Sequence, residues 1–294
     1  MDIAYPEIPR EIERVAEEMP SISPVLGKIN KISQEMDTSP RDLVKVIMLD
    51  PVLTGKVIKL VNSSFYGLPQ KIQSLAQAVV MLGMNTVKNL AISTAVISSV
   101  FIKEKRSPLD PEEFWRHCLA AAAGCRYLAV QMKIAPDLVE MYFIAGLLHD
   151  VGKVLFIRTD PLRYKKAIEE SNRLGIALTF SELVHFGCTH TQVGALLAKK
   201  WKLDSVLVDV IEQHHFLPNT QTPLMKETVM LVNNLCKQES LGTSGNCIIE
   251  EMADTLAGRL GLGQDSLNTM VELLPSELDK AAAFLDIVQE AGVE

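Results

Sequence analysis

The segment IMLDPVLTGKVIKLVNSSFY, residues 47–66, sets the helical character of the chain. Within it Asp50 precedes Pro51, and a residue before proline avoids the helical region, so an apolar helix that enters this segment should end there. That helix has its own start signal in residues 38–42, where a capping hydroxyl is followed by proline and then an acid. We expect the next helix over residues 52–61.

Helical spacing of apolar residues and helix-terminus signals continue on both sides of this segment. We expect further helices at residues 74–81, 85–101, 112–133, 135–151, 161–174, 179–186, 190–200, 204–215, 223–238, 247–261, 265–274 and 277–291. Apolar residues make up 48% of the chain but aromatic residues only 5%, a composition that suits packed helices better than sheets. The sequence therefore predicts an all-α protein, with residues 241–245 as its least ordered internal stretch.

A turn-rich break, SPLDP at residues 107–111, divides the chain. The length of 294 residues is enough for one large domain or two lobes. We therefore expect two helical lobes, residues 1–106 and residues 107–294, that share a broad interface.

The charge and the cysteine content of the chain limit which partners and which cellular compartment we expect for it. The net charge of −7 lacks the basic footprint of non-specific nucleic-acid binding, so we expect no direct nucleic-acid partner. The start of the chain lacks the pattern of a signal peptide, and no apolar run approaches the roughly 18 residues of a membrane span. The five cysteines form no CxxC pair and are typical of reduced, mostly buried thiols, which favours a cytoplasmic location.

The dipeptide His149-Asp150, in GLLHDVGK at residues 146–153, is the first candidate site. It lies at the end of an apolar helix, where two polar side chains are costly to bury unless they have partners. A carboxylate beside an imidazole can hold a divalent cation or orient a water molecule. The pair alone is a weak signal, so its meaning depends on the other histidines.

Those histidines lie at helix ends or on helix faces that could converge with the pair. They are His117, His190, His214 and His215. Glu113 lies four residues before His117 and shares its helix face. We expect His117, His190 and His214 to meet His149 and Asp150 in one pocket of the C-terminal lobe. His185 joins no pattern and is interpreted as an ordinary surface or core residue.

Each candidate also has an ordinary structural explanation. A single histidine on a helix is usually a polar residue with satisfied hydrogen bonds. Asp150 could cap the segment that follows it, and Lys153 could be a solvated surface lysine. Only the combination of several histidines with an aspartate makes metal binding a serious alternative to these structural roles.

Four stretches of the sequence resemble the signature of HDOD domains. They are residues 47–66, residues 72–83, FWRH at residues 114–117 and GLLHDVGK at residues 146–153. The resemblance covers roughly residues 19–235. It implies a bacterial, all-helical protein in which an HD-like bundle forms the C-terminal lobe. HDOD proteins are relatives of HD and HD-GYP phosphohydrolases, and the resemblance implies a regulatory or scaffolding role in signal transduction.

The resemblance extends to the metal-site pattern of HD-GYP enzymes. The matching positions are His117, His149, Asp150, Lys153, His190, His214 and His215, and Glu113 matches a ligand position of some of these enzymes. A divalent cation is thereby implied, with iron, manganese, zinc or nickel as candidates. Asp150 and Lys153 would be the catalytic residues of an active enzyme.

Two departures from that pattern bear on activity. The Gly-Tyr-Pro loop is absent, and FLPN at residues 216–219 stands where it would begin. The final aspartate ligand of HD enzymes is replaced, with Asn233 in LVNNL, residues 231–235, as the best match. An amide offers only a neutral oxygen and cannot act as a base, so it is a weaker ligand. Alternatively, Asn233 only caps or cross-links helices in the core.

Two functional hypotheses remain after these departures. The favoured one is a signalling module that acts mainly by binding other signalling proteins, with a partly retained metal site and little or no hydrolysis. The alternative is a metal-dependent phosphohydrolase that acts on a cyclic dinucleotide or another nucleotide. A sensor of small molecules or redox state that uses the bound metal is a third and less supported hypothesis.

Overall fold

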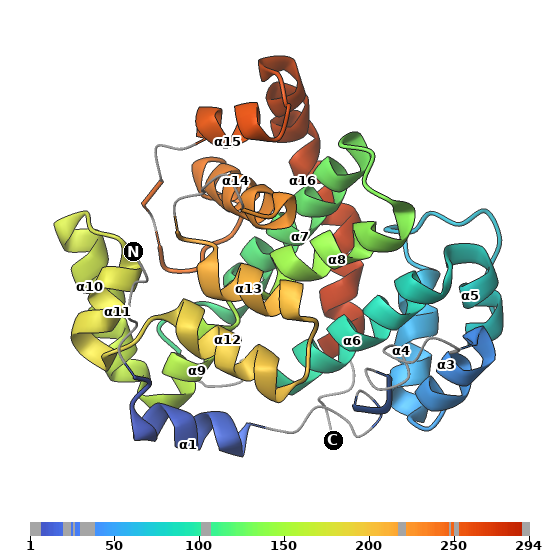
Figure 1. Cartoon of the computed structure of the whole chain (residues 1–294), viewed down its shortest axis with the longest axis horizontal. Helices are drawn as coiled ribbons and strands as arrows, with labels where there is room; N and C mark the ends of the chain where they lie inside the picture. Colours follow the sequence, from blue (N-terminus) through green and yellow to red (C-terminus); the bar gives the residue numbers. More distant parts are fainter. Residues whose placement is uncertain are drawn as a thin grey trace.

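A computed structural model describes residues 7–19, 25, 27–29, 39–100, 107–216, 222–246, 248–249 and 253–289. Its elements are α1 (Arg10–Glu18), α3 (Pro40–Ile47), α4 (Pro51–Val61), α5 (Leu75–Leu82), α6 (Met84–Val100), α7 (Pro111–Gln131), α8 (Pro136–Leu148), α9 (Gly152–Thr159), α10 (Pro161–Leu174), α11 (Leu178–Phe186), α12 (His190–Lys200), α13 (Ser205–Gln213), α14 (Leu224–Gln238), α15 (Ala253–Arg259) and α16 (Gln264–Gln289). All of them are helices, and no strand occurs in these ranges. The all-α prediction is confirmed (Figure 1).

The helix-terminus signals of the opening segment act locally as the sequence predicts. The Ser39 side chain caps α3 by accepting a hydrogen bond from the backbone of Asp42. Asp50, expected only to end the preceding helix, also caps α4, and its carboxylate lies 2.9 Å from the backbone nitrogen of Leu53. Thr38, the other hydroxyl of the start signal, lies outside the described residues.

Helices α7 and α8 pack along each other at the centre of the molecule, with α12, α13 and α14 around them (Figure 1). Their close approach depends on Gly146, because a Cβ there would lie 2.6 Å from the carbonyl oxygen of Ala121. Helix α6 packs on α8 and joins the α3–α6 group to this bundle. Tyr66 adds a polar link, since its hydroxyl donates to Glu140 of α8 at 3.2 Å.

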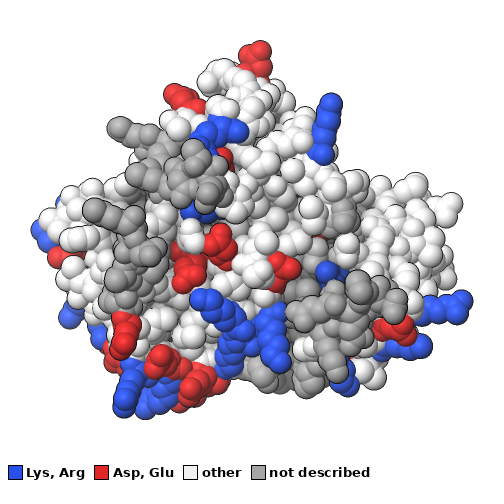
Figure 2. All heavy atoms as spheres, viewed as in Figure 1, with Lys and Arg blue, Asp and Glu red and all other residues white. Residues whose placement is uncertain are grey.

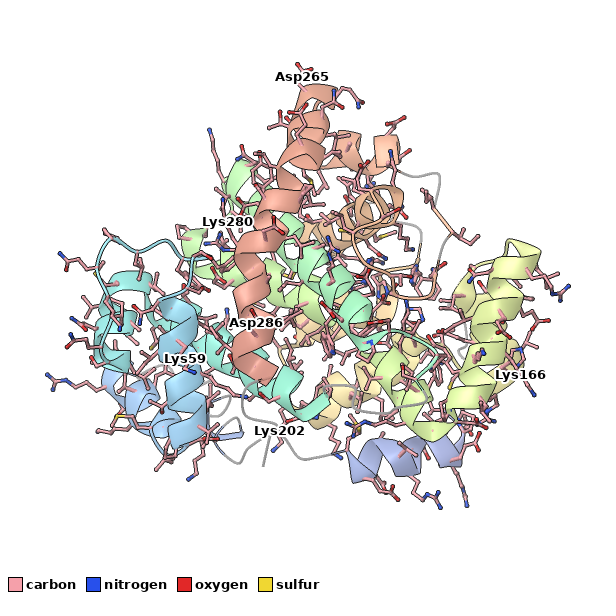
Figure 3. The ribbon with its side chains drawn as sticks, turned by 180° about the vertical axis from the view of Figure 1, so that it is seen from behind. Lys59, Lys166, Lys202, Asp265, Lys280 and Asp286 are labelled. Carbon is pink, nitrogen blue, oxygen red and sulfur yellow. The ribbon has the colours of Figure 1, made fainter. Side chains whose placement is uncertain are left out.

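The two ends of the described chain cross the division expected at residue 107. Helix α1 packs against α9 and α12 of the C-terminal bundle, on the opposite side of the molecule from α3, α4 and α5 (Figure 1). Helix α16 crosses the back of the molecule from Asp265 past Lys280 to Asp286, and it contacts α7, α6 and α4 (Figure 3). The C-terminal bundle is therefore contacted by the N-terminal helix α1, and the α3–α6 group by the C-terminal helix α16.

Several element bounds differ from the sequence-based expectation. Helices α1 and α9 were not anticipated, and the expected break between residues 274 and 277 is absent because α16 continues through Pro275. Proline removes one backbone hydrogen bond from a helix, but α16 packs against α7, and Leu274 and Leu278 on either side of the proline are buried. The expected helix at residues 247–261 is reduced to α15 in its described part.

The prediction that residues 241–245 are the least ordered internal stretch is wrong, because this segment is hydrogen-bonded to α7 and partly buried. After α14 the chain turns back across α7, and the backbone nitrogen of Thr243 donates to the carbonyl oxygen of Glu113 at 3.1 Å. Gly242 has φ +72°, and Ser244 is 2% exposed. The small residues of this segment let its backbone lie close to that of α7. We call residues 241–246, which cross the N-terminal half of α7, the strap.

The described cysteines agree with the expectation of buried thiols. Cys118, Cys125, Cys188 and Cys236 are buried free thiols. On the face shown in Figure 2, the described Lys and Arg side chains lie in small groups among Asp and Glu. In the described part of the chain, no helix is both long enough and apolar enough to cross a membrane.

Candidate metal centre

The His149-Asp150 pair lies in the tight turn between α8 and α9, at the centre of the bundle. His149 ends α8, and its Nδ1 donates to the carbonyl oxygen of Gly146 at 2.7 Å. Asp150 is 1% exposed. Only three residues separate α8 from α9, and the side chains of His149 and Asp150 are both buried in the bundle.

The structure brings the other histidines to the two oxygens of Asp150. On the Oδ1 side, His190 Nε2 lies at 3.3 Å and His214 Nε2 at 3.7 Å. On the Oδ2 side, His149 Nε2 lies at 3.2 Å and His117 Nε2 at 3.9 Å. Asp150 thus stands between two groups of imidazoles.

Each group has the composition and spacing of a cation site. Asp150, His190, His214 and the half-buried His215 form one set, and His117, His149 and Asp150 form the other, with donor atoms within 4.8 Å of one another in each. Metal–ligand bonds of about 2.0–2.2 Å place neighbouring donors about 2.8–3.6 Å apart. The distances from Asp150 to His149 and His190 already fall in that range.

Asn233 of α14 faces the second set. Its Oδ1 lies 3.1 Å from His117 Nε2, and its side chain is buried. Asn233 thus lies beside His117, and its oxygen carries no charge. Glu113 is not brought in, because its side chain is 42% exposed and lies beside Arg116 on the surface.

Three imidazoles are held in the tautomer that leaves Nε2 available for a cation. Nδ1 of His149 and Nδ1 of His214 donate to backbone carbonyls, the latter to Ile211 at 2.9 Å. Nδ1 of His190 lies 2.7 Å from the carboxylate of Glu182. Such partners are typical of metal-binding histidines, since they fix the ring and raise its basicity.

Burial and charge set the protonation of the cluster. Burial lowers the pKa of His117 and of His214 to about 3, so both are neutral and able to bind a cation at neutral pH. Burial by itself raises the pKa of Asp150, but neighbouring His149 and Lys153 lower it by more, to well below its usual value.

Two buried polar atoms support the fit of a cation. His149 Nε2 and Asp150 Oδ1 lie close to other side chains of the cluster, yet neither makes a hydrogen bond within the described residues. Leaving such atoms unsatisfied costs about 1–3 kcal/mol each. A divalent cation bound between the imidazoles and the carboxylate would satisfy both.

Lys153 is a buried part of the centre rather than a surface lysine. Its ammonium group donates to Asp150 Oδ2 at 2.8 Å. Its two other hydrogen bonds, each 3.1 Å long, go to the backbone oxygen and the hydroxyl of Ser244 in the strap. All three protons are used within the protein.

Sequence reasoning missed two residues of this centre. Glu182 is the only acid of the apolar helix α11 and precedes His190 by eight residues, and this isolated acid was the available signal. Ser244 gave no signal, because its Gly- and Ser-rich surroundings resemble any loop. His185 lies apart from the cluster and pairs with Glu170 at 2.7 Å.

A helical bundle in which a His-Asp pair gathers further histidines defines a protein of the HD type. The chain belongs to the HDOD family, whose domain model matches residues 19–217. Asn233 and the strap lie beyond the matched residues, whereas the histidines and Asp150 lie within them.

Comparison with solved structures supports this fold assignment. An HDOD domain protein of unknown function from Geobacter sulfurreducens is 26% identical, with a TM-score of 0.68 over 96% of this chain and 98% of the other. A provisionally named phosphohydrolase from Shewanella amazonensis SB2B has 22% identity and a TM-score of 0.71, over 95% and 98% of the two chains. A provisionally named signal transduction protein from Marinobacter aquaeolei VT8 has 21% identity and a TM-score of 0.76, over 97% and 63%.

A similar sequence also occurs in a longer protein. An uncharacterized protein of Treponema pallidum is 25% identical over 209 residues, which is 69% of this chain. The matched part is 39% of the length of that relative. Similar domains therefore occur as one part of a larger polypeptide.

Proposed function

We propose that this chain is a regulatory protein of the signal-transduction type that acts mainly by binding other proteins. In this proposal its His/Asp centre holds one divalent cation and hydrolyses phosphodiesters little or not at all. The observation that carries the proposal is the closure of the centre. His117, His149, Asp150, His190 and His214 are each at most 1% exposed.

The chemistry of the donor set also argues against efficient hydrolysis. A bound cation would supply Lewis acidity and lower the pKa of a bound water. Asn233, however, can neither offset cation charge nor accept a proton as a base. The three protons of Lys153 are already donated to Asp150 and Ser244, so none is available to a substrate phosphate.

A metal-dependent phosphohydrolase is the second candidate, and one observation favours it. Asp150 presents one oxygen to each group of imidazoles, which is the arrangement of a carboxylate that bridges two cations. Two-metal sites place their ions about 3.5–4 Å apart and hydrolyse phosphate esters. Under this alternative a nucleotide or a cyclic dinucleotide would be the substrate.

Elemental analysis and turnover separate the two candidates. Native protein purified without added metal should contain about one iron, manganese, zinc or nickel ion per chain. It should show little or no hydrolysis of cyclic dinucleotides and of a chromogenic phosphodiester. Robust turnover by the native protein would overturn the proposal in favour of the phosphohydrolase.

The variant Asn233→Asp tests the role of the amide. A carboxylate there would add one anionic ligand next to His117, so metal content should rise above that of the native protein. Asn234→Asp is the matched control, because it also buries a carboxylate in α14, one residue further along. If Asn233→Asp only lowers the melting temperature, as a buried unpaired carboxylate would, then Asn233 is a structural residue.

A further inference from the structure

The histidines of the centre differ in the charge of the group that orients them. His149 and His214 donate from Nδ1 to neutral backbone carbonyls. Only His190 of these three faces a carboxylate with its Nδ1, that of Glu182, which is fully buried in α11. This difference divides the centre into two unequal halves.

Glu182 is tied to His190 by more than one contact. Its carboxylate accepts from the backbone nitrogen of His190 at 2.8 Å and lies 2.7 Å from Nδ1 of the same residue. The hydroxyl of Tyr164 donates to the other oxygen at 3.1 Å. Because a carboxylate only accepts hydrogen bonds, Nδ1 of His190 must carry a proton, and in the neutral ring Nε2 then holds the lone pair.

That lone pair lies in the half of the centre nearest Asp150 Oδ1. His190 Nε2 is 3.3 Å from this oxygen and 3.4 Å from His214 Nε2. The opposite half has a positive neighbour, because Lys153 donates to Asp150 Oδ2 at 2.8 Å. Negative charge thus backs one half of the centre, and positive charge lies in the other.

We infer that Glu182 is a positioning residue that directs the first cation to the half formed by Asp150 Oδ1, His190 and His214. The inference rests on the proposed cation of the preceding subsection. Glu182 fixes the tautomer of His190 and adds the negative charge that Asp150 alone does not supply. In the other half, beside His117 and His149, the Lys153 ammonium supplies the positive charge that a second cation would otherwise bring.

The backbone of His190 has a second close contact besides its hydrogen bond to Glu182. Gly152 of α9 approaches so closely that any Cβ on it would overlap the carbonyl oxygen of His190, so the α9–α12 contact holds the main chain. Changing Glu182 should therefore release the imidazole ring while helix α12 stays in place.

The test compares Glu182→Gln with Tyr164→Phe. The glutamine keeps the shape of the side chain but loses its charge, and it should weaken Mn²⁺ and Zn²⁺ binding by about 10- to 100-fold in a chelator competition titration. Tyr164→Phe removes the other hydrogen bond to the same carboxylate. It should change metal affinity by less than about threefold, since the contacts of Glu182 with His190 remain.

A second readout needs no metal. Long-range ¹H–¹⁵N correlation spectra of the metal-free native protein should show His190 protonated at Nδ1, the tautomer that Glu182 selects. Because the native spectrum alone reports the tautomer, the inference stays testable even if the variant does not fold.

The possible failures are distinguishable. A native protein that binds no divalent cation would overturn the proposed metal centre and this inference together. Native cation binding with equal affinity in Glu182→Gln, or a native His190 protonated at Nε2, would overturn the role of Glu182 alone.

Discussion

Replacing Gly242 by alanine should show how strongly the strap of residues 241–246 holds the centre closed. Gly242 has φ +72°, where a residue with a side chain pays about 1–2 kcal/mol. A Cβ there would also overlap the carbonyl oxygen of Glu113 and the backbone nitrogen of His117. Both are backbone atoms of α7, so the strap must move rather than the helix.

The cost of that movement follows from the contacts it breaks. The hydrogen bond from Thr243 to Glu113 contributes about 1 kcal/mol, and the bonds from the Lys153 ammonium to Ser244 about 1.5–3 kcal/mol. Gly242→Ala should therefore lower the free energy of unfolding by about 3–6 kcal/mol.

Gly175→Ala is the matched control for this change. Gly175 ends α10 with φ +64°, but a Cβ there would meet nothing within 4 Å. Only the backbone strain of about 1–2 kcal/mol applies to it. Urea unfolding of both variants measures the difference, and equal destabilisation would refute the argument that the strap is packed tightly against α7.

Three further outcomes are expected. Burial holds the pKa of His117 and His214 at about 3, against 6.5 when unfolded, so the unfolded chain takes up protons first as the pH falls. The metal-free protein should be most stable above about pH 6.5 and lose up to about 1.4 kcal/mol per pH unit per histidine below it; a urea midpoint unchanged from pH 7 to pH 5 would contradict this. Gly152→Ala should prevent folding, measured by circular dichroism, because its Cβ would overlap the backbone of His190; a stable helical variant would disprove that contact. Lys153→Met should raise the number of bound cations and lower the melting temperature of the metal-free protein, and a variant that matches the native protein in both would argue against the place given to its ammonium group.

Local signals in the sequence were sufficient for the helical class and for most helices. Ser39 caps the helix whose start the sequence predicts, because capping depends only on a few neighbouring residues. The family assignment was equally available, since its signature consists of short contiguous stretches of sequence. The candidate ligands could be named for the same reason, as residue types at positions of a known pattern.

Tertiary contacts decided what local signals could not. Glycine usually disfavours a helix, yet Gly152 begins α9 because only a residue without a side chain can lie against the backbone of His190. Pro275 interrupts backbone hydrogen bonding, yet α16 continues because it packs against α7 and α4 and buries Leu274 and Leu278 on either side of the proline. Gly152 and Pro275 each disfavour a helix locally, and in both cases tertiary packing outweighs that preference.

The centre itself shows the same division. The sequence determined which imidazoles and which carboxylate were available, but the orientation of each ring depends on partners distant in the chain. Glu182 reaches His190 only because α11 turns back at Gly187, and Ser244 reaches Lys153 across 91 residues of sequence. Hydrogen bonds between such groups depend on atomic positions set by the whole bundle, so only the tertiary structure could decide them.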